Sequence, residues 1–214
     1  MACSTFLTVF FASILAVVAI AAAVVMFYRF YFLRKPVRKS IPGNVVVSPA
    51  DGKIVRIIEI KAGKPVQVSK GLLGRFGLLT SDTIKDGYVI VIMMTPLNVH
   101  YQRAPLDGSV EKVKYSEGRF FNAMKSAASL TALENERNEI LLSTKIGKVK
   151  VVQVAGFLAR RIRCFLKPKQ KVHKGGEIGL ICLGSQVLLV MPKLRLSVKE
   201  GQRVVDGETI IARF

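Results

Sequence analysis

The sequence contains few cysteines and few acidic residues. Its three cysteines are too few and too scattered for a disulfide framework, and the chain has no CxxC pair or Cys/His cluster of the kind that binds zinc. We therefore expect a reducing compartment and no metal site. Charged residues make up 22% of the 214 residues, although half of the chain is hydrophobic. This balance excludes a polytopic membrane protein and a disordered tail.

Charge is also absent from the N-terminus, because residues 1–28 contain no charged side chain. The 22 residues from Phe6 to Phe27 carry only two hydroxyl groups, those of Thr8 and Ser13. A helix of about 20 apolar residues is long enough to cross the hydrocarbon core of a bilayer. A cleaved signal peptide would have a basic start and a shorter apolar core, and this sequence has neither. We therefore predict a transmembrane helix that is retained as an anchor.

Basic residues follow this apolar run. Five cations without an intervening acid lie at Arg29, Arg34, Lys35, Arg38 and Lys39. Because positive charge is retained on the cytoplasmic side, residues 1–39 are predicted to anchor residues 40–214 at the cytoplasmic face of the cell membrane. Residues 40–214 contain 28 bases and 14 acids, so an anionic partner is expected. No helix-turn-helix or RNP-like motif is present, which favours anionic lipid headgroups over nucleic acid as that partner.

Residues 40–214 have the pattern of a β domain. Short segments rich in Val and Ile are separated by turns that contain Gly, Pro, Asn and Asp, and this pattern predicts strands. The predicted strands are residues 45–47, 53–60, 65–68, 88–94, 110–115, 139–143, 148–155, 177–183, 186–191, 195–198 and 208–212. Only residues 122–133 have a weak helical pattern. The expected fold is mainly β: an N-terminal transmembrane helix followed by a β-sandwich or barrel-sandwich-hybrid-like domain.

Two hairpin-like repeats, at residues 172–181 and 198–211, resemble those of biotinyl- and lipoyl-type barrel-sandwich hybrids. A carrier of that type needs a lysine at a hairpin tip, usually after a methionine, and here Met191 is followed by Pro192. A membrane-tethered adaptor or carrier without covalent chemistry therefore stands as the alternative function. An exposed sheet edge would also allow such a domain to form a homo-oligomer.

A Gly184-Ser185 pair lies between two apolar segments. Taken alone it predicts only a turn, and it differs from the nucleophile elbow G-x-S-x-G because the second glycine is missing. Four further motifs precede it in order: Pro49-Ala-Asp51-Gly52, Pro96-Leu-Asn-Val-His100-Tyr-Gln-Arg-Ala-Pro-Leu-Asp107-Gly, Asn135-Glu-Arg-Asn138 and Ala159-Arg-Arg-Ile162. Together the five motifs resemble the phosphatidylserine decarboxylase family, most closely its short form, which includes archaetidylserine decarboxylase-like proteins.

The resemblance implies a proenzyme that cleaves itself between Gly184 and Ser185. The products would be a β chain of residues 1–184 and an α chain of residues 185–214. Ser185 would become a covalent pyruvoyl group, which forms a Schiff base with the amine of an anionic serine phospholipid and accepts electrons as CO2 leaves. No metal or diffusible cofactor would be required. Phosphatidylserine and archaetidylserine share the phosphoserine headgroup, so the choice between them stays open.

Self-cleavage requires a base that activates Ser185, and the chain has two histidines. His173 lies in a polar turn and is expected at the surface, whereas His100 lies in the family's histidine motif. Asp51 is the candidate for orienting His100 or for acting on Ser185 itself. The long-form enzymes have a second histidine where this chain has Arg103. Either His100 serves both self-cleavage and decarboxylation, or Asp51 and a water perform the cleavage.

Three arginines are candidates for binding the substrate anion. Arg103 cannot act as an ordinary base, but its guanidinium could hold the substrate carboxylate or phosphate in a bidentate grip. Arg161 and Arg163 would share one face if their segment is a strand. They could bind the lipid phosphate or simply form a solvated basic face.

Overall fold

The computed structural model describes residues 2–39, 41–61, 82–118, 135–156, 162–182 and 185–214. The chain divides into two compact units, Met1–Lys35 and Pro36–Phe214. The first unit is a helix, α1 (Ala2–Met26), which continues as a π-helix, η1 (Phe27–Phe32).

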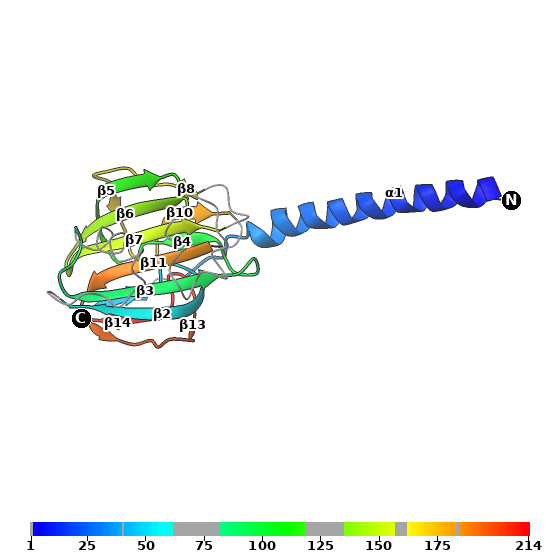
Figure 1. Ribbon diagram of the computed structural model, residues 1–214. Helices are drawn as coiled ribbons and strands as arrows, with labels where there is room; N and C mark the ends of the chain where they lie inside the picture. Colours follow the sequence, from blue (N-terminus) through cyan, green and yellow to red (C-terminus); the bar gives the residue numbers. More distant parts are fainter. Residues whose placement is uncertain (1, 40, 62–81, 119–134, 157–161, 183–184) are drawn as a thin grey trace. The chain divides into compact units, whose positions relative to one another are not determined.

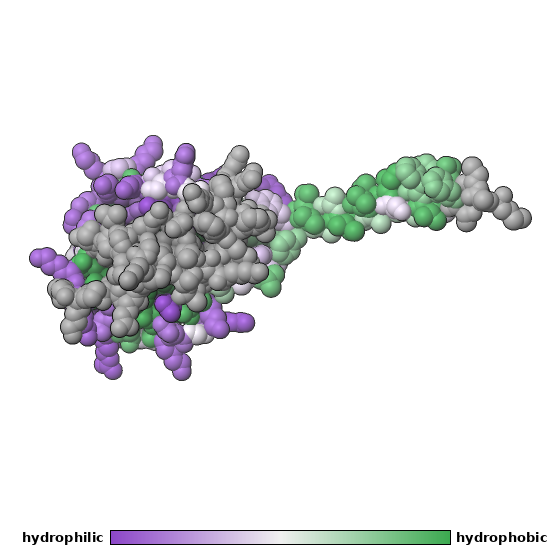
Figure 2. Space-filling view, viewed as in Figure 1, coloured by the Kyte–Doolittle hydropathy of each residue, from purple (hydrophilic) through white to green (hydrophobic). Residues whose placement is uncertain are grey.

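Helix α1 is apolar on every side. Its large side chains are exposed, and Phe6 and Leu15 each keep 71% of their surface accessible. The helical segment Phe6–Phe32 is long and apolar enough to cross a membrane, and it is the only such helix in the part of the chain that the structure describes. Figure 2 shows hydrophobic residues along the helix. A helix that is hydrophobic all round requires an apolar surrounding, so the predicted apolar helix is confirmed and could anchor the protein to a membrane.

In the described residues, the second unit is built from antiparallel strands in three sheets (Figure 1). The largest sheet is curled into a half-barrel. From edge to edge it contains β13 (Arg203–Val204), β2 (Gly52–Ile60), β3 (Gly87–Met94), β11 (Ser185–Pro192), β7 (Gly147–Ala155), β6 (Arg137–Thr144), β5 (Gly108–Ser116) and β9 (Lys171–Val172). One three-stranded sheet contains β1 (Val45–Val47), β14 (Ile210–Arg213) and β12 (Arg195–Leu196). The other contains β4 (Tyr101–Arg103), β10 (Glu177–Ile181) and β8 (Ile162–Cys164).

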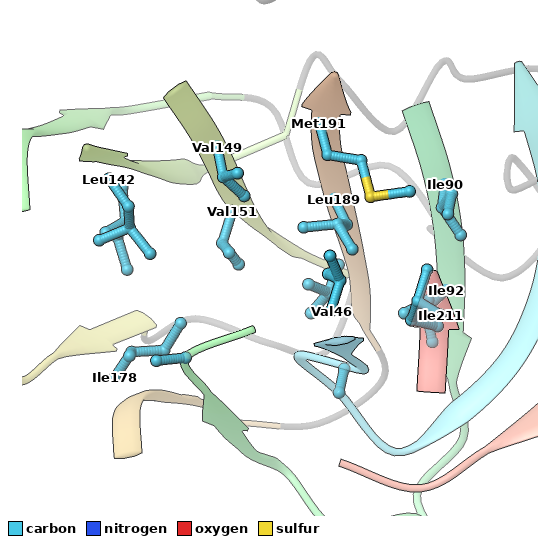
Figure 3. Packing of buried hydrophobic residues seen from close by; sticks show 14 of the residues in the cluster. Val46, Ile90, Ile92, Leu142, Val149, Val151, Ile178, Leu189, Met191 and Ile211 are labelled. Atoms are coloured by element: carbon cyan, nitrogen blue, oxygen red, sulfur yellow. The ribbon is translucent and has the colours of Figure 1, made fainter. Parts of the chain in front are cut away.

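The main hydrophobic core joins one face of the large sheet to both small sheets. Figure 3 shows side chains of the large sheet, such as Leu189 and Val151, packed with Val46, Ile178 and Ile211 from the small sheets. The opposite face of the large sheet carries a smaller buried cluster that includes Val152 and Val190. Because both faces are buried, the central strands are continuous apolar runs and lack the alternating pattern of a half-exposed sheet.

The predicted mainly β fold is confirmed. Ten of the eleven predicted strands are present, and their ends differ from the prediction by at most two residues. Four short strands were not predicted, namely β4, β8, β9 and β13, because two or three residues are too few to show a period. The predicted strand 65–68 and the predicted helix 122–133 lie outside the described residues.

The core predicts how two similar substitutions should differ. Leu189→Ala on β11 should lower the free energy of unfolding by about 2–5 kcal/mol, because Leu189 is completely buried and its truncation leaves a cavity. Leu97→Ala, at a side chain that is 61% exposed, should change it by less than about 0.5 kcal/mol. Urea unfolding of both variants in detergent micelles measures the difference, and equal losses would contradict this description of the core.

Candidate active site

Ser185 is the first residue of β11, in the interior of the large sheet. Its neighbours across the strand pairs are Met94 on β3 and Ala155 on β7. The serine is completely buried, and its hydroxyl donates a hydrogen bond to the Met94 sulfur at 3.4 Å. A thioether is a weak acceptor, so this contact binds the hydroxyl proton only weakly. Gly184, the other half of the predicted cleavage site, lies outside the described residues.

Asp51 and His100 lie in loops at the same end of the large sheet as Ser185. Asp51 precedes β2, whose residue Lys53 is paired with Met93 on β3. The Asp51 carboxylate accepts hydrogen bonds from the backbone N–H of Val99 at 2.8 Å and from the Asn98 amide at 3.4 Å. Asp51 therefore holds the turn that leads directly into His100.

His100 is completely buried and immediately precedes β4. Its carbonyl oxygen accepts hydrogen bonds from the Gln102 side chain at 2.7 Å and from the backbone N–H of Ile181 at 3.2 Å. Ile181 ends β10, only a few residues before Ser185 in the chain. The sequence candidates Ser185, His100 and Asp51 are thus on segments that meet at one end of the sheet. His173, in contrast, has a side chain that is 90% exposed, as expected.

A chain of buried amides leads into the same region. Asn138 donates to the Gln153 oxygen at 2.8 Å, and Gln153 donates to the Gln102 oxygen at 2.7 Å. The Gln102 nitrogen then donates to His100 and lies 3.8 Å from the Met94 sulfur. All three amide residues are at most 2% exposed.

Arg103 takes part in a separate buried cluster with Asp206. Its Nε donates to the Asp206 carboxylate at 2.7 Å, and its two terminal nitrogens donate to the carbonyl oxygens of Gly175 at 2.9 Å and Pro36 at 3.0 Å. Arg38 binds the other oxygen of Asp206 at 2.7 Å. These protein acceptors occupy the guanidinium on three sides, an arrangement that does not favour a bidentate grip on a substrate anion.

Of the two remaining arginine candidates, only Arg163 lies in the part of the chain that the structure describes. Arg163 is exposed on β8, and Arg161 lies outside the described residues. Arg163 is paired with Leu180 on β10, which is paired on its other side with Tyr101, the neighbour of His100. Arg163 is therefore two strands away from the residue that follows His100, or about 10 Å across the sheet.

Comparison with known proteins gives a consistent result. The family model for phosphatidylserine decarboxylase matches residues 26–212. A phosphatidylserine decarboxylase proenzyme of Chlorobaculum tepidum is 38% identical over 199 residues, which are 92% of this chain and 82% of the relative. The chain belongs to the phosphatidylserine decarboxylase family. Another phosphatidylserine decarboxylase proenzyme, from a Wolbachia strain of Brugia malayi, is 40% identical over 86% of this chain and 74% of its own length.

Membership confirms the resemblance seen in the sequence motifs and makes the protein a carboxy-lyase. A Methanocaldococcus jannaschii proenzyme that carries the name archaetidylserine decarboxylase is 36% identical over 91% of this chain and 93% of its own length. Relatives named for diacyl and for archaeal lipids are thus about equally similar to this chain.

Sequence reasoning assigned no role to Gln102 or Gln153, although Gln102 lies within a family motif, and it left open whether Asn135–Asn138 lines the site or only forms a turn. The signal was present in β7, where Gln153 is an uncharged polar residue inside the apolar run Val151-Val-Gln-Val-Ala155. A polar side chain in such a run must find hydrogen-bond partners when the strand is buried.

The buried Asp206 cluster predicts a large loss of stability when its acid is removed. Asp206→Ala leaves Arg103 buried without its carboxylate, which should lower the free energy of unfolding by about 3–5 kcal/mol. Glu208→Ala is the matched control, because Glu208 is 37% exposed and lies 3.8 Å from Arg38. Its loss should be below about 1 kcal/mol in the same urea titration. Similar effects of the two substitutions would show that the cluster is not a stabilising element.

Proposed function

We propose that this chain is a proenzyme that cleaves itself between Gly184 and Ser185 and then decarboxylates the serine headgroup of an anionic phospholipid. Membership of the decarboxylase family supports the second step. The proenzyme names of the relatives support processing of the chain. The observation that carries the proposal is the placement of Ser185 at the start of β11, beside the loop of His100 that Asp51 holds.

In the proposed cleavage, the Ser185 hydroxyl attacks the carbonyl carbon of Gly184 and converts the amide into an ester. A base removes the hydroxyl proton, and we assign this role to His100 because histidine titrates near neutral pH. Asp51 then acts as a positioning residue through Val99. β-Elimination releases the Gly184 carboxylate and leaves a dehydroalanine, which tautomerises and hydrolyses to a pyruvoyl group with loss of ammonia.

The surroundings of Ser185 fit a pyruvoyl group. The residue lies between Met94 and Ala155, and hydrogen-bonded pairing of β11 on both sides begins at Ser185 itself. The group would therefore start at a fixed position next to the loop of His100. Its ketone supplies an electron sink for the electron pair that remains when CO2 leaves the substrate. His100 would deliver the proton that replaces the carboxylate.

The phosphate of the substrate has Arg163 as its proposed partner, together with Arg161. Arg163 is exposed and about two strands from the His100 region, so a headgroup could extend between them. The apolar helix α1 and the five cations that follow it support attachment to the cytoplasmic face of a membrane that contains the lipid. Either a diacyl or an ether-linked serine lipid meets these requirements, because the headgroup is the same.

Mass spectrometry tests the cleavage. Wild-type protein should yield a fragment of residues 185–214 that is lighter than its serine form by one ammonia molecule, and Ser185→Ala should remain uncut. Ser197→Ala, an exposed serine in the same fragment, should be cut as wild type is. The cut proteins should then release CO2 from phosphatidylserine in mixed micelles. An uncut wild-type chain would favour the membrane-tethered adaptor.

The sheet predicts that the two products remain together. Residues 185–214 contain β11, which is paired with β3 over eight residues and with β7 over six, as well as β13 and β14. The 30-residue fragment should therefore co-elute with the longer product in detergent and separate only at denaturant concentrations that unfold the sheet. Size-exclusion chromatography at increasing urea measures this. Separation well below the unfolding midpoint would contradict the described pairing.

A further inference from the structure

The buried amides Asn138, Gln153 and Gln102 form a bridge across the core. Asn138 on β6 and Gln153 on β7 are direct neighbours in the large sheet, whereas Gln102 belongs to β4 in a small sheet. The hydrogen bond between Gln153 and Gln102 therefore joins two sheets through an otherwise apolar interior. A buried amide that loses its partner is costly, so this bond strongly fixes the position of β4 relative to β7.

The bridge has one direction. Each amide nitrogen donates to the oxygen of the next residue, and the last donor, on Gln102, reaches the carbonyl oxygen of His100. Each of the two glutamines uses both its oxygen and its nitrogen, which fixes the orientation of the amide plane. Successive hydrogen bonds of this kind polarise one another in a low-dielectric interior. The last hydrogen bond of the bridge, from the Gln102 nitrogen to the carbonyl oxygen of the proposed base His100, is therefore strengthened.

The bridge also lies beside Ser185. Ser185 lies opposite Ala155 on β7, and Gln153 is two residues from Ala155 on the same strand. The side chains of Ser185 and Gln153 therefore point to the same face of the sheet, as diagonal neighbours. Diagonal neighbours of this type are about 7–8 Å apart. The Met94 sulfur accepts the hydrogen bond of the Ser185 hydroxyl and lies 3.8 Å from the Gln102 nitrogen. The same amide therefore contacts the His100 backbone and the side chain that holds the serine.

The Gln153 amide packs closely against Gly179 on β10. A methyl group at Gly179 would lie 2.5 Å from the Gln153 nitrogen and 2.6 Å from the carbonyl oxygen of Arg163. Any side chain at Gly179 would thus displace the Gln153 amide or β8. A glycine at this position is needed because the Gln153 amide and the backbone of β8 both approach the backbone of β10.

We infer that Gln153 is a positioning residue of the active site, which acts through Gln102 to set the position of His100 relative to Ser185. This inference rests on the proposed function. It assigns to the amide bridge the task of keeping base and nucleophile at reaction distance, because a displacement of about 1 Å can slow such a reaction by about 100-fold. Gln153 itself contacts neither the cleaved bond nor the substrate in this assignment.

The rate of self-cleavage in a pulse-chase experiment on the full-length chain tests the inference. Gln153→Leu keeps a similar volume but removes the amide, and it should slow cleavage by at least about tenfold. Val149→Ala is the matched control, because Val149 is buried on the same face of β7 but outside the bridge. It should lower the urea midpoint yet leave the cleavage rate within about twofold of wild type.

A graded series separates positioning from simple destabilisation. Gln102→Leu should slow cleavage the most, Gln153→Leu less and Asn138→Leu the least, because the effect should decrease with distance from His100 along the bridge. The triple leucine variant removes all three amides together, and the His100 carbonyl keeps the Ile181 N–H as its donor. It should therefore fold even if a single variant does not, and it should still cleave slowly. In the cleaved enzyme, Gln153→Leu should lower kcat and leave KM within about twofold.

The outcomes distinguish the two proposals. If wild type cleaves and Gln153→Leu or the triple variant cleaves as fast as Val149→Ala, the positioning role is wrong and the proposed function stands. If the slowing follows the urea midpoint and not the order along the bridge, the amides have only a structural role. If wild type itself is never cleaved, the proposed function fails, and the positioning role fails with it.

Discussion

The pairing of β11 along both edges is the constraint on which the rest of the catalytic unit depends. All eight of its residues are paired with β3, and the first six, beginning with Ser185, are also paired with β7. Its alternate side chains reach the two hydrophobic clusters on opposite faces of the sheet. A strand held in this way cannot move without unfolding of the sheet, so Ser185, its first residue, has a fixed position. The same pairing would retain the strand after a break in front of it.

Among the buried polar residues that the structure describes, the Asp206 cluster and the amide bridge each connect segments that are distant in sequence. Asp206 joins Arg103 and Arg38, and through them the start of the second unit, β4 and the C-terminal segment. The amide bridge joins β6, β7 and β4. Buried charges and amides contribute little net stability when they are paired but are costly when unpaired, so such groups select one arrangement of the strands over others. Both clusters include a residue of β4, Arg103 in one and Gln102 in the other, and β4 begins immediately after His100.

Much of the fold follows from local patterns. The apolar helix and ten strands were predictable because a membrane span and a buried strand each leave a run of apolar residues in the sequence. The strands β4, β8, β9 and β13 were not, because their two or three residues take an extended conformation only through their partners in the sheets. The motifs around Ser185, His100 and Asp51 likewise indicated the family, which the comparison with known proteins confirms.

The sequence by itself thus determined the anchor-like helix, the mainly β domain, the Gly-Ser pair and the family. Only the tertiary structure decided that β11 lies between β3 and β7, that Arg103 binds Asp206 and that Gln153 reaches Gln102. The physical reason is the separation along the chain. Local periodicity reports which face of a strand is buried, but partners that are 103 or 51 residues apart are chosen by the packing of whole sheets. The role of an arginine or an amide depends on such a partner, so its residue type alone does not reveal it.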